Sequence, residues 1–136
     1  MRDTRGELAQ GPVGVVVVDD QRIFRHAARD VIAAAHPDFV LLGEATSGEH
    51  ALATVDELHP DLVLVDVRMA GMDGIETARR LKGAHPGTVV VLVTTEEPLN
   101  LPAAVGFCGA ADLVRKQDFG PSLLRRLWSA HGATAQ

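Results

Sequence analysis

The stretch Gly-Val-Val-Val-Val-Asp-Asp, residues 14–20, decides the fold of this chain. Its apolar part, Val13–Val18, is a run of mostly β-branched residues, as expected of a strand whose two faces are both buried. Similar runs, Val89–Val93 and the shorter Leu62–Val65, follow later in the chain. Such strands occur in parallel sheets that helices cover on both sides. The stretch therefore predicts an α/β protein in which acidic residues follow a buried strand.

Helical patterns alternate with these strands. A helix is expected over Arg22–Ala35, whose apolar residues at helical spacing are Ile23, Ala27, Val31 and Ala34. Ser47 is expected to cap a helix that runs through Leu58, and Asp73 with Glu76 has the spacing of a capping box for a helix over Asp73–Ala84. The other expected elements are the strands Phe39–Gly43 and Asp112–Arg115 and an amphipathic helix, Phe119–Ala130, with Leu123, Leu124, Leu127 and Trp128 on one side. The alternation predicts an open parallel sheet with helices on both faces.

Three His-Pro pairs repeat at intervals of about one strand-helix unit: His36-Pro37, His59-Pro60 and His85-Pro86. Each pair falls between an expected helix and the next strand. Proline cannot continue a helix, and a histidine there lies near the negative end of the helix dipole. We therefore interpret the pairs as helix stops rather than as metal or phosphohistidine chemistry.

Length and composition limit the classes of protein to which this chain can belong. The chain has 136 residues and a net charge of −5, which fits one globular domain and argues against a direct grip on nucleic acid. The single cysteine, Cys108, excludes a disulfide framework and indicates a reducing compartment. No apolar run approaches the ~20 residues of a membrane helix, and the polar start of the chain does not resemble a signal peptide. A cytoplasmic protein without a membrane anchor is expected.

Polar residues follow the expected strands where each one ends. Asp19 and Asp20 follow the first strand, Asp66 the third, Thr94 the fourth and Lys116 the fifth. In open parallel sheets the ligand site lies outside the carboxyl ends of the strands, so these side chains should gather at one edge. Clustered carboxylates favour a hard cation, and magnesium fits because it accepts a few carboxylates and keeps several waters; Mn²⁺ is the alternative. A carboxylate such as Asp66 can also attack phosphorus, while a lysine and a hydroxyl pair with phosphate oxygens.

In these motifs the chain resembles the receiver domains of bacterial two-component response regulators. The matching pieces are Val-Val-Val-Asp19-Asp20, Leu-Val-Asp66-Val-Arg-Met-Ala-Gly-Met-Asp-Gly74, Val-Leu-Val-Thr94, and Gly109-Ala110 followed by Lys116. The resemblance covers about residues 13–130. It implies a flavodoxin-like, doubly wound, five-stranded parallel (βα)5 sheet in three αβα layers. The segment Asp20-Gln-Arg-Ile-Phe-Arg25 looks most like receivers that precede a helix-turn-helix output domain.

The resemblance implies a role for each matching residue. Asp66 corresponds to the phosphoacceptor, with Asp19, Asp20 and the backbone carbonyl of Arg68 as further magnesium ligands. Thr94 corresponds to the switch hydroxyl and Lys116 to the phosphate-pairing lysine. The implied partner is a sensor histidine kinase or a phosphotransfer protein, and the domain is a signalling phosphoacceptor rather than a turnover enzyme. DNA would be reached only through an output domain not contained in these residues, and a homodimer through the last helix stays open.

The chain departs from the family pattern in several places. Ala70 stands where the family usually has proline, Gln117 follows the lysine in place of proline, and Leu113 replaces the switch aromatic. The segment Glu97–Cys108 contains Pro98 and Pro102, so its helix is expected to start late, near Leu101, and to be short or mobile. Residues 1–12 are interpreted as a flexible leader and 131–136 as a tail or the start of a linker.

Plainer interpretations stay open beside these roles. Asp19-Asp20 could be a turn, Thr94 a strand residue and Lys116 a surface charge, and Asp73 is interpreted as a helix cap. Cys108 and Trp128 are interpreted as packing residues and Arg125-Arg126 as a solvated face. Two competing functions are a phosphorylation-independent interaction module on the same fold and an unrelated magnesium phosphohydrolase. The second commonly shows another acid two places after the nucleophile, where this chain has Arg68.

Overall fold

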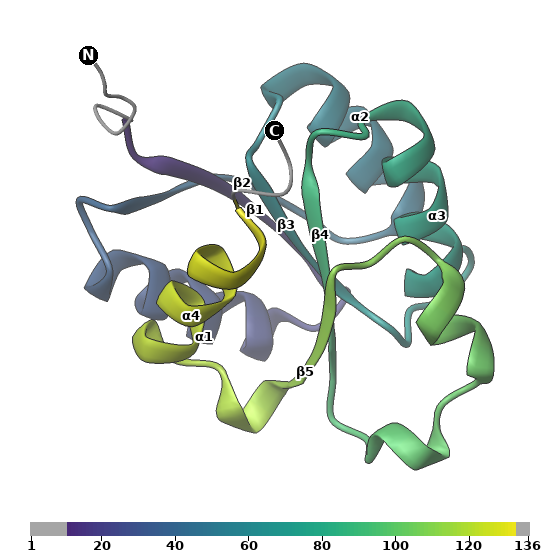
Figure 1. Cartoon of the computed structure of the whole chain (residues 1–136). Coiled ribbons are helices and arrows are strands. Elements are labelled where there is room, and N and C mark those ends of the chain that lie inside the picture. Colours follow the sequence, from purple (N-terminus) through teal and green to yellow (C-terminus); the bar gives the residue numbers. More distant parts are fainter. Residues whose placement is uncertain (1–10, 133–136) are drawn as a thin grey trace.

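The computed structural model describes residues 11–132, and one five-stranded sheet lies at its centre (Figure 1). The strands are β1 (Val13–Val18), β2 (Phe39–Ala45), β3 (Leu62–Asp66), β4 (Val89–Thr94) and β5 (Asp112–Arg115), in the order β2-β1-β3-β4-β5. Every neighbouring pair is parallel. The predicted doubly wound parallel sheet is confirmed, and the chain changes direction across the sheet between β1 and β3, the kind of place where α/β sheets bind ligands.

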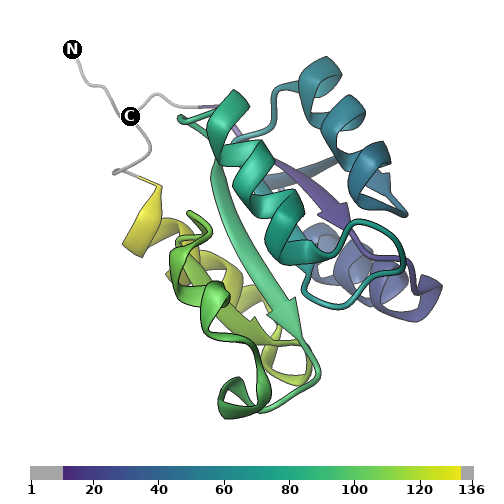
Figure 2. The same ribbon diagram turned by 90° about the vertical axis from the view of Figure 1, so that its right-hand side faces the viewer.

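Helices cover both faces of the sheet. The helices α1 (Arg22–Ala34) and α4 (Pro121–His131) lie on one face, and α2 (Gly48–Leu58) and α3 (Gly74–Ala84) lie on the other (Figures 1 and 2). Within residues 11–132 no helix combines the length and the apolar character that crossing a membrane requires.

The two faces of β1 explain why its sequence is a continuous apolar run. Val15 and Val17 belong to the core cluster that packs with Phe24 and Leu124, and Val16 and Val18 belong to the cluster on the opposite face. All four valines are fully buried. A strand buried on both faces has no position at which a polar side chain would meet water.

The predicted helix is confirmed as α1, but its buried face lies one residue along from the apolar residues whose spacing indicated the helix. Ile23 is 86% exposed, and the buried stripe is Phe24, Ala28 and Ile32. Both sets have helical spacing and differ by one position, so periodicity alone does not separate them. The buried stripe has the larger side chain at two matched positions, Phe24 beside Ile23 and Ile32 beside Val31, so this face buries more apolar area against the sheet.

The predicted helix boundaries are confirmed at their caps. Ser47 accepts a hydrogen bond from the amide of His50 (3.0 Å), and Asp73 accepts one from the amide of Glu76 (2.9 Å). The reciprocal half of the capping box is not formed, since the Glu76 carboxylate pairs with Arg79 and Arg80 instead. The His-Pro pairs are helix stops as predicted: His59 and His85 are the residues that close α2 and α3, and His36-Pro37 follows the end of α1.

The helix predicted near Leu101 is not formed. Two short 3₁₀ turns, η1 (Pro98–Asn100) and η2 (Ala103–Phe107), connect β4 to β5. Pro98 opens η1 and Pro102 caps η2, and neither has an amide hydrogen to donate to an α-helical ladder. The three residues between the prolines are too few for an α-helix, and the residues after Pro102 form the 3₁₀ turn η2 where the helix was predicted. Residues 11–132 therefore form four α-helices around five strands.

Candidate functional site

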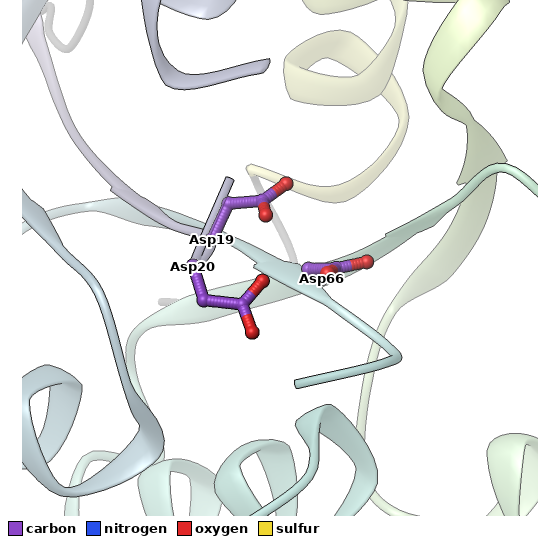
Figure 3. A group of neighbouring side chains, drawn as sticks. All are labelled: Asp19, Asp20 and Asp66. Atoms are coloured by element: carbon purple, nitrogen blue, oxygen red, sulfur yellow. The ribbon is translucent and has the colours of Figure 1, made fainter. Parts of the chain in front are cut away.

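Three carboxylates meet at the carboxyl ends of β1 and β3 (Figure 3). Asp19 and Asp20 follow the last residue of β1, and Asp66 is the last residue of β3. One oxygen from each carboxylate lies within 4.8 Å of the others. Asp19 is fully buried and Asp66 is 4% exposed, whereas Asp20 faces solvent. The predicted acidic cluster is therefore assembled, with one side open.

Local hydrogen bonds hold the two acids that follow β1. The Oδ1 of Asp19 accepts from the amide of Gln21 (2.9 Å), and its backbone carbonyl accepts from Nη1 of Arg25 (2.9 Å). The Oδ2 of Asp20 accepts from the amide of Ala70 (3.3 Å). The last bond ties the loop after β1 to the loop after β3, so the two halves of the cluster are held together.

Lys116 enters the cluster from the end of β5. Its Nζ lies 2.6 Å from Oδ2 of Asp19 and 3.5 Å from Oδ1 of Asp66, and its side chain is 10% exposed. An ammonium between two buried carboxylates offsets part of their repulsion. Lys116 therefore lies within the acidic cluster and is mostly buried there, closer to Asp19 than to Asp66.

The environment of Asp66 disfavours its ionised form. Burial, and secondarily the charge of Asp19, raise the pKa of Asp66 from 3.8 to about 6, against the opposing effects of the Lys116 ammonium and a backbone hydrogen bond from Arg68. A carboxylate with this pKa is largely ionised at neutral pH and poorly compensated. A further positive charge beside Asp66 would lower this pKa and stabilise the carboxylate.

Thr94 ends β4 beside Asp66, in the strand that pairs with β3. Its side chain is 1% exposed, and its Oγ1 accepts a hydrogen bond from the amide of Glu96 (3.0 Å). The Glu96 carboxylate in turn binds Arg68 (Nε–Oε2, 2.6 Å), which joins the loops after β3 and β4. The bond from Glu96 uses a lone pair of the hydroxyl, so the hydroxyl hydrogen is not consumed by it.

Gly74 sets the start of α3 against the carboxyl end of β3. A Cβ on this residue would stand 2.0 Å from the backbone oxygen of Asp66, so no other residue fits without moving the backbone. The amide of Gly74 donates to the carbonyl of Val67 (2.9 Å). Helix α3 therefore rests directly on the segment that carries the buried acid.

The structure brings together Asp19, Asp20, Asp66 and Lys116, and it places Thr94 at the end of β4, next to the end of β3. That the Arg68 carbonyl binds magnesium stays a prediction. Sequence reasoning missed Arg25, which joins the Asp19 carbonyl to Glu44 on β2 (Nε–Oε1, 3.3 Å). A basic residue in the first turn of the helix that follows the acid pair was the signal that could have found it.

Comparisons with known proteins agree with this architecture. Residues 15–127 match the model of the response regulator receiver domain. Over 104 residues the chain is 38% identical to the response regulator GacA of Pseudomonas viridiflava, covering 76% of this chain and 48% of GacA. Over 106 residues it is 39% identical to a protein-glutamate methylesterase/protein-glutamine glutaminase of Geobacillus kaustophilus, covering 76% of this chain and 30% of that protein.

Solved structures agree as well. The receiver domain of a putative response regulator NarL from Mycobacterium tuberculosis is 29% identical with a TM-score of 0.77, covering 89% of this chain and 97% of that one. The response regulator domain of Thermotoga maritima CheB is 28% identical with a TM-score of 0.77, covering 88% and 96%. The chain spans less than half the length of the two curated relatives but nearly all of these two domains. The chain belongs to the response regulator receiver domain family of two-component systems.

Proposed function

We propose that this receiver domain accepts a phosphoryl group on Asp66 from a phosphohistidine of a sensor histidine kinase or a phosphotransfer protein. The observation that carries the proposal is the buried, partly compensated carboxylate of Asp66 in a cluster with Asp19, Asp20 and Lys116. An ionised carboxylate is needed for attack, and the pKa of about 6 leaves Asp66 largely ionised at neutral pH.

The transfer exchanges one bond to phosphorus for another. A carboxylate oxygen of Asp66 bonds to phosphorus while the bond between phosphorus and the imidazole nitrogen breaks, and the imidazole keeps the electron pair. The product is an aspartyl phosphate, and no oxidant or further reactant is required. Lys116 is placed to pair with one phosphoryl oxygen, and Thr94 is placed to donate its hydroxyl hydrogen to another.

The donor set fits a hard divalent cation, Mg²⁺ or alternatively Mn²⁺. Three carboxylate oxygens lie within 4.8 Å of one another, and Asp20 is open to solvent, so ligand waters have room. Asp19, Asp20, Asp66 and the carbonyl of Arg68 would hold the ion. When bound, it would neutralise charge that develops on the transferring phosphoryl group.

The test uses acetyl phosphate as the phosphodonor with Mg²⁺ present, read by intact mass. A mass gain of one phosphoryl group is expected for the wild type and not for Asp66→Asn, and chelation of the metal should suppress it. Asp30→Asn, at an exposed position on α1, is the matched control and should behave like the wild type. An unchanged wild-type mass, or an equal gain in Asp66→Asn, would contradict the proposal.

A second candidate is an interaction module that works without phosphorylation. Two observations favour it: the segment that joins β4 to β5 contains no α-helix, and Leu99 and Phe107 within it are 97% and 84% exposed. It predicts partner binding that Asp66→Ala leaves unchanged, so loss of binding in that variant would count against it. Contact with DNA is proposed to need a separate output domain, since these residues carry a net charge of −5.

Turnover of a separate substrate is not part of the proposal. The methylesterase relative is 39% identical, but the chain spans only 30% of it, so its named activity is not carried over. In the phosphohydrolase alternative a second acid follows the nucleophile by two places, and Arg68 holds that place with its guanidinium on Glu96. Steady hydrolysis of a phosphate ester would revive this alternative.

A further inference from the structure

We propose that Phe24 and Phe119 form an aromatic shelf that positions the ammonium of Lys116 for the transfer to Asp66. The inference rests on the proposed function and adds to it two positioning residues that do not touch the reacting atoms. The juxtaposition is built by α1 and by the chain just before α4, which lie side by side on one face of the sheet (Figure 1).

Phe24 contacts the ammonium, and Phe119 packs against Phe24. The Nζ of Lys116 is 4.9 Å from the centroid of the Phe24 ring, within the range of a cation–π contact. The Phe119 ring is tilted at 54° to the Phe24 ring, with the centroids 5.9 Å apart, an arrangement typical of stable aromatic pairs. Phe24 is 7% exposed, so its ring is held by the core and not by solvent.

Local structure brings both rings to this place. Phe24 begins the buried stripe of α1 with Ala28 and Ile32, so it is the member of the stripe nearest the acid pair. Beyond Lys116 the chain makes a 3₁₀ turn, η3 (Lys116–Asp118), closed by the bond from the Phe119 amide to the Lys116 carbonyl (3.1 Å). This turn brings the chain back toward α1, so that the Phe119 ring packs against the ring of Phe24.

A neutral ring can hold the Lys116 ammonium in place without the added negative charge that another acid would bring. Lysine has a long flexible side chain, and fixing it in one place costs conformational entropy. The ring face attracts the ammonium without competing for its hydrogen bonds and without adding a negative charge to the cluster. The ammonium is thus kept between Asp19, at 2.6 Å, and Asp66, at 3.5 Å, where a phosphoryl oxygen on Asp66 would arrive.

The first arm of the test varies the ring on the full chain. With acetyl phosphate and saturating Mg²⁺, Phe24→Leu is expected to slow phosphorylation roughly 3- to 30-fold, the range that a cation–π contact corresponds to. Phe24→Tyr and Phe24→Trp keep a ring face and are expected to remain within about threefold of the wild type. The Mg²⁺ affinity should change little in any of them, because the carboxylates that would hold the ion are untouched.

Two controls separate positioning from general stability. Phe39→Leu removes a ring that is 3% exposed on β2 in the same core cluster, and it should lower stability without slowing phosphorylation. In a Lys116→Gln background Phe24→Leu should add little to the loss of beryllofluoride affinity, because the ring acts through the lysine. Additive losses, or Phe24→Leu as fast as Phe24→Tyr, would overturn the shelf while wild-type phosphorylation left the proposed function standing.

A second arm needs no phosphodonor. The ε-methylene protons of Lys116 should show an upfield ring-current shift in the NMR spectrum of the wild type, lost in Phe24→Leu and kept in Phe24→Tyr. Unshifted protons in the wild type would overturn the shelf whatever the kinetics. A wild type that takes no phosphoryl group would instead overturn the proposed function, and the catalytic part of this inference with it.

Discussion

The acid site and the segment between β4 and β5 are built in different ways. The acids and Thr94 lie at the ends of strands that are buried on both faces, and hydrogen bonds and an ion pair with Lys116 hold the acids in place. The connecting segment consists of two 3₁₀ turns, and its large apolar side chains Leu99 and Phe107 point into solvent. The difference teaches that the sheet fixes the position of the chemistry, whereas the two prolines leave the conformation of the connecting segment open to more than one arrangement.

The largest expected effect comes from the tightest point of the acid site. Gly74→Ala would place a Cβ 2.0 Å from the Asp66 oxygen, where only backbone could give way. We expect a loss of about 3 kcal/mol or more in the free energy of unfolding, measured by urea denaturation, and a displaced Asp66.

Gly83→Ala is the control on the same helix. Nothing lies within 4 Å of a Cβ built on Gly83, so replacing this helical glycine should stabilise the chain by about 0.5–1 kcal/mol. Equal effects of the two changes would show that the contact between α3 and the end of β3 does not hold the site.

The next effect concerns the charge of Asp66. Its pKa of about 6 in the folded chain lies above the ordinary 3.8, so the folded chain binds this proton more tightly than the unfolded chain. Without metal, the free energy of unfolding should therefore fall as the pH rises from about 4 to about 6, and should stay lower above that window. The two pKa values correspond to about 3 kcal/mol as an upper bound.

Asp66→Asn removes that dependence. Above pH 6 and in the presence of a chelator, this variant should be more stable than the wild type by up to the same amount, and below pH 4 the difference should vanish. Thermal melts at several pH values measure it, and added Mg²⁺ should close the gap by stabilising the wild type more. A wild type that is more stable than Asp66→Asn at neutral pH without metal would contradict the pKa shift.

Some of these features could be predicted from the sequence, and others could not. The strand β1 could be predicted from its valine run alone, because a strand buried on both faces has no polar position. The clustering of the acids at one edge of the sheet could be predicted from the parallel topology. The buried face of α1 could not, since two apolar stripes one residue apart fit the same period. The choice depends on which stripe meets the sheet, which is a tertiary fact.

Contacts between distant segments also lay beyond the sequence. The Phe24 ring contacts Lys116 and Phe119 because α1 and α4 lie on the same face of the sheet. The spacing of these residues in the sequence does not predict that contact. The segment from Glu97 to Cys108 was misjudged for another reason. Two prolines allow either a late α-helix or two separate turns; the structure has the turns, with Leu101 and Val105 packed against the core.

A smaller effect is expected at Thr94. Thr94→Val keeps the shape of the side chain and removes the oxygen that accepts from the Glu96 amide, so a cost of about 1 kcal/mol in the free energy of unfolding is expected. Thr94→Ser keeps the oxygen and should restore both that bond and the response to beryllofluoride, followed by amide NMR shifts. A full response in Thr94→Val would contradict the proposed hydrogen bond from the Thr94 hydroxyl to a phosphoryl oxygen.

The smallest effects are expected in the connecting segment. Leu99→Ser and Phe107→Ser alter side chains that are 97% and 84% exposed, and each should change the free energy of unfolding by less than about 0.5 kcal/mol. Val105→Ser is the control, because Val105 packs against the core from the same segment and its loss should cost about 1–2 kcal/mol. Urea denaturation measures all three. A loss above about 1 kcal/mol in Leu99→Ser or Phe107→Ser would mean that these side chains stabilise the free domain. A smaller loss would leave them available for contact with a binding partner.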